Sequence, residues 1–84
     1  MTDDELAARV VETMRRPYHR VIRGEPIEGY VGEVPELPGC LTGGDTPEET
    51  LKNLEEAMAV WLEVAILRGA DIPHPAAGLA QLTG

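Results

Sequence analysis

The sequence is short of aromatic residues, cysteine and positive charge, and each shortage excludes a class of protein. It has no Phe, one Trp and two Tyr among 84 residues, so the core must be built mainly from aliphatic side chains. Its single cysteine, Cys40, excludes an internal disulfide. Seven Lys and Arg against fifteen Asp and Glu give a net charge of −8, which argues against binding nucleic-acid phosphates through the overall field.

Long apolar runs are also absent from the sequence. It contains no run of about 18 apolar residues that could cross a bilayer, and no signal peptide, so we expect a cytoplasmic protein with no membrane partner. The length predicts one domain over 1–84. A chain this short often gains stability from self-association, which favours a homodimer or homotetramer. The acidic composition suits a basic protein partner, or serves solubility alone.

The stretch 46–68 predicts a long helix around which the rest of the chain is organised. Thr46 and Glu49 can form a capping box, and Pro47 occupies the first helical position, where its missing N–H costs nothing. Gly69 favours the left-handed conformation that ends a helix. Both ends of this helix are therefore marked by local chemistry.

The apolar pattern of this helix predicts what it contacts. A stripe facing the core is assigned to Leu51, Leu54, Met58, Trp61 and Ala65. Apolar residues continue around the other sides of the second half, so we expect one face on the sheet and another against an N-terminal helix or a second subunit. The predicted oligomer interface consists of the apolar residues that lie off the stripe, Val60, Val64 and Leu67.

The first half of the chain predicts an extra helix followed by an antiparallel meander. The helix is expected over 3–16, with Thr2 and Glu5 as its capping pair. Three strands are predicted, at 18–23, 30–34 and 40–42. Residues 24–29 have turn chemistry and join the first strand to the second. Gly32 is weak in a strand interior, so it indicates a bulge or the close approach of another backbone.

Two further segments leave alternatives open. Pro35 to Asp45, with two prolines and three glycines, either carries binding by strand addition or loop insertion, or only positions the third strand. After the Pro-rich loop that follows the long helix, 79–82 forms either a fourth strand at a sheet edge or a tail within 76–84.

Catalytic and metal-binding chemistry find little support in the spacing of residues. His19, His74 and Cys40 are scattered and no pair has ligand spacing, so we expect no metal or cofactor. A Cys40–His19 nucleophile pair lacks an orienting third group, which favours a half-buried structural cysteine. Two-metal nuclease chemistry would need carboxylates to converge on one sheet face, and those available are Glu33, Glu36 and Asp45. The expectation is that the protein is not an enzyme.

Several motifs over roughly Tyr18 to Pro75 resemble the HicB-like antitoxin family. They are Pro35-Glu36-Leu37-Pro38-Gly39-Cys40, Gly44-Asp45-Thr46, Asn53-Leu54-Glu55-Glu56-Ala57 and Trp61-Leu62-Glu63. The resemblance implies an α+β fold in which a helix crosses one face of three antiparallel strands and a fourth strand follows, a partial ribonuclease-H-like arrangement. With the extra N-terminal helix, for which the family offers no role, the expected order is α-β-β-β-α-β over a core of 18–75.

The same resemblance implies a role as the antitoxin of a type II toxin–antitoxin system. Such a protein neutralises a small, basic, HicA-type toxin that cleaves messenger RNA. The toxin contact is predicted at Glu33, Glu36, Leu37, Cys40, Glu55 and Glu56. Family members that repress their own operon carry a DNA-binding segment after the Pro-rich loop, and Ala76 to Gly84 is too short for one, so we expect no DNA binding. The alternative is a stand-alone oligomer with a structural or regulatory role and no toxin.

Overall fold

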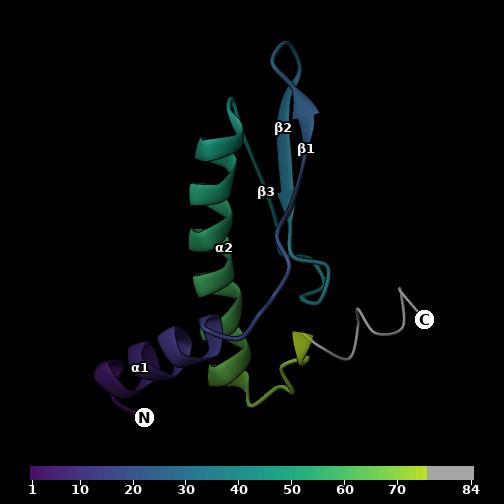
Figure 1. The fold of residues 1–84 in the computed structure, drawn as a ribbon. Helices are drawn as coiled ribbons and strands as arrows, with labels where there is room; N and C mark the ends of the chain where they lie inside the picture. The colour runs from purple at the N-terminus through teal and green to yellow at the C-terminus, as the bar shows by residue number, and fades with distance from the viewer. Residues whose placement is uncertain (76–84) are drawn as a thin grey trace, which may run out of the picture.

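A long helix lies across one face of a three-stranded antiparallel sheet in the computed structural model, which describes residues 1–75 (Figure 1). The elements are α1 (Asp3–Met14), β1 (Val21–Glu25), β2 (Gly29–Glu33), β3 (Leu41–Gly44) and α2 (Pro47–Arg68). The strands lie in the order β1-β2-β3. The α+β class and the order α-β-β-β-α are confirmed, and the predicted strand at 79–82 lies outside the described residues.

The ends of α2 form as the local chemistry predicts. The backbone N–H of Glu49 donates to Thr46 Oγ1 at 3.0 Å, so Thr46 is the N-cap. Gly69 has a φ of 66°, and the N–H of Ala70 reaches back to the carbonyl of Ala65 at 2.9 Å. This left-handed cap satisfies carbonyl groups that the helix leaves without partners.

α1 is shorter than predicted and ends at Met14 instead of Arg16. The N–H groups of Arg15 and Arg16 donate to the carbonyls of Glu12 and Thr13, three residues back. The last turn is therefore tightened, and Pro17 disfavours the helical conformation in the residue before it.

The strand boundaries differ from the predicted ones at both sides of the sheet. β1 begins at Val21 instead of Tyr18, because the N–H of His19 donates to the Glu36 carboxylate at 3.2 Å and so is not available to a strand ladder. β3 begins one residue later than expected and runs to Gly44, which pairs with Tyr30.

The glycines of β2 and β3 allow α2 to lie close to the sheet. A Cβ atom on Gly32 would lie 3.0 Å from Thr50 Cγ2, and one on Gly44 would lie 2.7 Å from Thr50 Oγ1. The close approach predicted at Gly32 is therefore made by side chains of α2, not by a backbone, and the register of β2 runs without a bulge.

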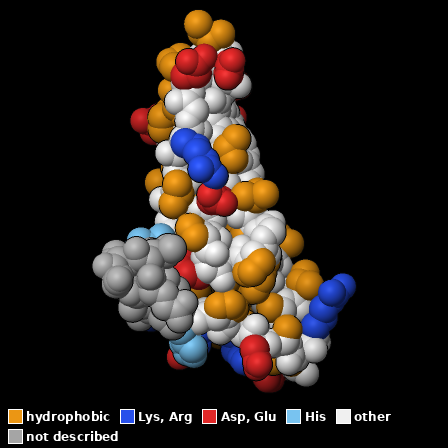
Figure 2. Space-filling view, turned by 90° about the vertical axis from the view of Figure 1, so that its right-hand side faces the viewer, with side chains coloured by type: hydrophobic (Ala, Val, Ile, Leu, Met, Phe, Trp, Pro, Cys, Tyr) orange, Lys and Arg blue, Asp and Glu red, His pale blue; other side chains and the backbone are white. Residues whose placement is uncertain are grey.

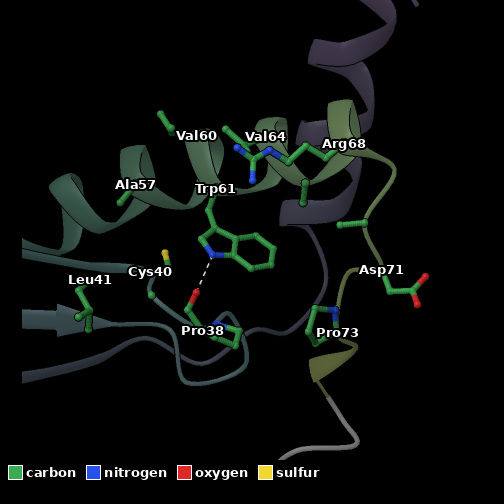
Figure 3. Close-up of a pocket in the computed structure, with 13 residues that line it drawn as sticks. Pro38, Cys40, Leu41, Ala57, Val60, Trp61, Val64, Arg68, Asp71 and Pro73 are labelled. Carbon is green, nitrogen blue, oxygen red and sulfur yellow. Dashed lines mark hydrogen bonds between the residues drawn. The ribbon is translucent and has the colours of Figure 1, made fainter.

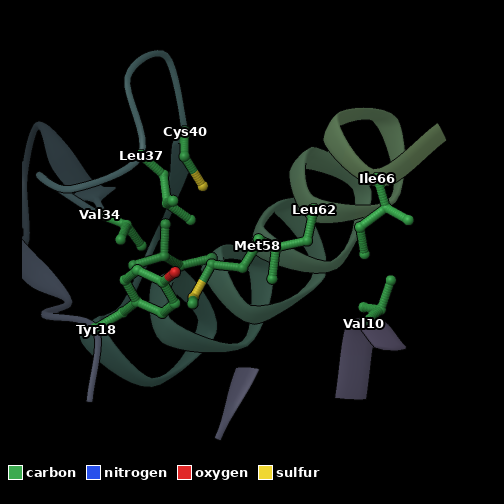
Figure 4. Close-up of a cluster of buried hydrophobic side chains, with 9 residues drawn as sticks. Val10, Tyr18, Val34, Leu37, Cys40, Met58, Leu62 and Ile66 are labelled. Carbon is green, nitrogen blue, oxygen red and sulfur yellow. The ribbon is translucent and has the colours of Figure 1, made fainter. Parts of the chain in front are cut away.

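The core lies between α2, the sheet and the loop from Val34 to Cys40 (Figure 4). Leu54, Met58 and Leu62 of α2 are fully buried. One member of the predicted stripe is wrong, because Leu51 is 40% exposed, whereas Trp61 is half-buried and packs against the core cluster. Thr50 takes the place nearest the sheet at the start of α2, and Trp61 turns toward the loop. The buried positions that the stripe missed are Thr50, Leu62 and Ile66.

α1 covers a second side of α2. Val10 is buried within the same cluster as Ile66, and Leu6 and Met14 pack against that cluster. The apolar residues Val60 and Leu67 remain 61% and 62% exposed. The sheet packs against one side of α2, and α1 of the same chain packs against a second side. The side of α2 that carries Val60 and Leu67 stays exposed.

The burial of Leu54 predicts a large loss of stability on truncation. Leu54→Ala should lower the free energy of unfolding by about 2–5 kcal/mol, because it removes a fully buried side chain and leaves a cavity. Leu51→Ala, on the same helix but exposed, should cost less than about 1 kcal/mol. Urea unfolding followed by circular dichroism measures both, and equal losses would contradict this assignment of the core.

Candidate functional site

An apolar groove runs along α2 beside the loop that leads into β3 (Figure 3). Its volume is about 760 Å³, and Val60, Trp61 and Val64 form much of the helix wall. The Trp61 indole Nε1–H donates to the carbonyl oxygen of Pro38 at 2.8 Å, which holds the loop against the helix. With walls of this kind, the groove suits apolar side chains better than a polar substrate.

The face of the sheet turned away from α2 is a second uncovered apolar surface. We call it the open sheet face and define it as Val21, Arg23, Val31, Glu33 and Leu41, which the register places side by side. Val31 and Leu41 are 48% and 58% exposed. Arg23 Nη2 donates to Glu33 Oε1 at 2.6 Å across this face. Figure 2 shows hydrophobic side chains gathered around charged ones on this side of the molecule.

The negative charge of the chain is concentrated in one part of the structure. Residues 25–56 hold nine Asp and Glu against one Lys, which accounts for the whole net charge of −8. The remaining residues hold six acidic and six basic side chains. The segment 25–56 comprises the hairpin turn, β2, β3 and the first half of α2, whose outer ends lie together at one end of the molecule (Figure 1).

Glu36 is a structural carboxylate. Its buried side chain accepts the backbone N–H of His19 at 3.2 Å and lies 2.9 Å from His19 Nδ1. Burial acts to raise the pKa of Glu36, but hydrogen bonds from the His19 side chain and from backbone N–H groups outweigh it and hold that pKa below its usual value. The ionised carboxylate therefore fastens the loop to the chain just before β1.

Other residues predicted to contact a toxin also hold the fold. Leu37 and Cys40 are buried in the core, and burial raises the pKa of the Cys40 thiol, which keeps it protonated and weakly nucleophilic. Glu55 accepts two hydrogen bonds from Arg20, at 2.5 Å and 3.1 Å, and so ties α2 to the chain before β1. Of the predicted set, Glu33 borders the open sheet face and Glu56 is exposed on α2.

The predicted set does not converge on one surface, and the open sheet face, apart from Glu33, was not predicted. Val21, Val31 and Leu41 come together only when the hairpin register is known. Part of this surface could have been predicted from the sequence. Side chains alternate between the two faces of a strand, so residues 21 and 23 share one face, as do 31 and 33. The contact of Trp61 with Pro38 had no local signal.

Metal binding and membrane insertion find no support in the part of the chain that the structure describes. Within residues 1–75, no three or more His, Cys, Asp or Glu side chains are grouped so that they could hold a metal ion. None of the helices found there has the length and apolar character needed to cross a membrane.

These features define a small α+β binding module with two uncovered apolar surfaces and a concentrated acidic region. The comparisons with known proteins agree with this class: the family described as HicB_like antitoxin of bacterial toxin-antitoxin system matches residues 18–83. The chain belongs to this HicB-like antitoxin family. Family membership points to a non-catalytic role, and α1 precedes the matched region.

Three relatives show how far the similarity extends. A UPF0150 protein of Synechocystis is 41% identical over 54 residues, which cover 64% of this chain and 74% of that protein. A UPF0150 protein of Thermoplasma acidophilum is 42% identical over 45 residues, 54% of this chain and 65% of that protein. An uncharacterized 14.9 kDa protein of Haemophilus phage HP1 is 37% identical over 46 residues, only 35% of its own length. No solved structure matches the chain significantly.

The lowered pKa of Glu36 predicts an acid-sensitive loop. The ionised group stabilises the fold fully above its unfolded pKa of about 4.3, and this contribution is lost as pH falls through the lower folded pKa. Glu36→Gln should therefore cost about 1–3 kcal/mol at pH 7, because buried hydrogen bonds to a charge are weakened, and this difference from the unsubstituted protein should shrink below about pH 4.

Urea unfolding at a series of pH values measures this effect. Glu28→Gln, which removes the same charge from the exposed hairpin turn, is the matched control and should change stability little at any pH. A stability difference for Glu36→Gln that stays constant down to pH 2 would show that the charge of Glu36 is not what stabilises the loop.

Proposed function

We propose that this chain neutralises a small, basic, HicA-type ribonuclease toxin by protein–protein binding, as the antitoxin module of a type II system in the cytoplasm. Family membership supports a toxin as the partner, and the acidic segment 25–56 supports a basic one. A concentrated negative region attracts a basic protein, speeds the encounter and orients it before contact. The proposal requires no cofactor and no catalytic group from this chain.

The open sheet face is the proposed toxin-binding surface. Much of its area lies within the acidic segment, since Val31, Glu33 and Leu41 belong to 25–56, and Leu41 also lines the groove. Apolar patches that carry a few charged groups are typical of protein–protein interfaces. Glu33 is paired with Arg23 in the free protein and can exchange this partner for a basic side chain of the toxin. Glu56, exposed on α2, adds to the attraction.

The other predicted contact residues support this surface from behind. Glu36, Leu37 and Cys40 fix the loop that connects β2 to β3, and Glu55 fixes α2 to the start of the sheet. Their proposed role is to position the strands that carry Glu33 and Leu41. Substitutions at these four positions would therefore reduce toxin binding through loss of structure.

A second candidate function is a stand-alone homo-oligomer without a toxin. The observation in its favour is the exposed apolar stripe of Val60, Val64 and Leu67 on α2, which borders the groove and resembles an unpaired interface. A homodimer or homotetramer built on this stripe is compatible with toxin binding at Val21 and Val31, which do not line the groove, whereas Leu41 belongs to both surfaces.

Matched substitutions on the two surfaces test the proposed function. Val31→Arg places a positive charge on the open sheet face and should weaken binding of the HicA-type toxin from the same genome by about tenfold or more, equivalent to about 1.4 kcal/mol. Val60→Arg, the same change on α2, should leave the toxin affinity within about threefold. Isothermal titration measures binding, and inhibition of RNA cleavage measures neutralisation.

The outcomes separate the two candidates. A toxin that neither binds the unsubstituted protein nor is inhibited by it would overturn the antitoxin proposal and leave the stand-alone oligomer. Toxin binding that is lost with Val60→Arg and kept with Val31→Arg would move the contact to α2. Circular dichroism of both variants ensures that only folded protein is compared.

A further inference from the structure

α1 carries an exposed stripe in which opposite charges flank small and apolar residues. The stripe consists of Asp4, Ala8, Val11 and Arg15, whose spacing of four, three and four residues places them on one side of the helix. All four residues are exposed, and Val11 is exposed to 55%. The helix lies outside the family match at 18–83, so the family assigns it no function.

This stripe lies on the side of α1 opposite its buried residues, and Val11 also borders Glu63 of α2 in a shared hollow. The opposite side of the helix holds Val10, which is buried against α2, together with Leu6 and Met14. Figure 1 shows α1 at one end of the molecule, across the second half of α2 and projecting away from the sheet. A second helix that packs on the stripe would therefore meet Val11 next to Glu63 of α2.

We propose that α1 is a homodimerisation element that pairs with α1 of a second copy in antiparallel orientation. A twofold axis between residues 9 and 10 sets Asp4 opposite Arg15 of the second copy and Ala8 opposite its Val11. The same axis repeats both contacts in the other direction. The stripe is thus complementary to itself, which is what a symmetric dimer interface requires.

Charge selects both the partner and the orientation. In antiparallel pairing each Asp4 meets an arginine, whereas parallel pairing would set Asp4 opposite Asp4 and Arg15 opposite Arg15. Residues 3–16 hold four acidic side chains and three arginines, a net charge of −1, so two copies repel each other less at α1 than over 25–56, where the net charge is −8. Ala8 allows the two helices to approach closely, and Val11 then loses contact with water.

The size of the interface predicts weak association. A helix of 12 residues is about 18 Å long. Two such helices bury less surface than the roughly 1,200 Å² that is the lower end for stable complexes. The dimer should therefore dissociate on dilution, with a Kd in the micromolar range or weaker. This interface is separate from the stripe of Val60, Val64 and Leu67 and does not depend on toxin binding.

Sedimentation of the full chain over a concentration series tests the interface with two charge reversals. Asp4→Arg sets arginine against arginine, and Arg15→Glu sets acid against acid, so each variant alone should associate about tenfold more weakly than the unsubstituted protein. Mixed in equal amounts, the two variants are complementary again, and a heterodimer should form with an affinity within about threefold of the original. At about 0.15 M salt the Debye length of about 8 Å screens distant charges while direct contacts persist.

Arg9→Glu is the matched control. It changes the net charge as Arg15→Glu does, but Arg9 borders the segment 70–74 on another side of α1, so self-association should be unchanged. The proposal is overturned if the unsubstituted protein stays monomeric up to millimolar concentration, or if Arg15→Glu does not weaken the dimer. A mixture of folded variants that fails to associate overturns it as well. Toxin binding plays no part in these measurements, so they stand apart from the test of the antitoxin function.

Discussion

The rest of the structure depends on the close contact of α2 with the glycines of the sheet. Thr50 lies over Gly32 and Gly44 at distances that leave no room for a side chain on Gly44 and only a tight fit for one on Gly32. This contact sets the helix low enough on the sheet for Leu54 and Met58 to become fully buried. A single helix can cover only one face of a sheet, and a sheet and one short helix can cover only part of α2. The open sheet face and the outer side of α2 therefore stay uncovered, and a partner can reach both.

The uneven distribution of charge gives these surfaces different partners. Residues 25–56, from the hairpin turn to the first half of α2, hold the entire negative surplus, whereas residues 3–16 carry a net charge of only −1. A basic partner is attracted to the first region, where the open sheet face lies. Two identical acidic chains approach each other with least repulsion at the second, where α1 lies. Toxin binding and self-association, as proposed, would therefore occur at separate parts of one molecule and could coexist.

The family motif at 35–40 has a structural role in this fold. Residues 35–40 form the most distinctive motif in the chain, and the sequence analysis placed a partner on three of them. In the fold Leu37 and Cys40 fill the core, and Glu36 binds the backbone of His19. The closure of the loop over α2 accounts for the placement of these three side chains. Val21, Val31 and Leu41, the exposed apolar residues of the open sheet face, come together only through the register of the strands.

Local chemistry was enough to predict α2, both of its caps, the hairpin and the α+β class, because capping residues, turn residues and apolar periodicity act over a few neighbouring positions. The same chemistry predicted that Val60, Val64 and Leu67 lie off the core stripe, as they do. It could not place Leu51 outside the core, start β1 at Val21 or assemble the open sheet face. Each of these depends on residues far apart in the chain: on where Thr50 meets the sheet, on which carboxylate takes the N–H of His19, and on the register that sets Val31 beside Arg23. Burial and strand pairing are properties of such distant contacts, and these form only in the folded chain.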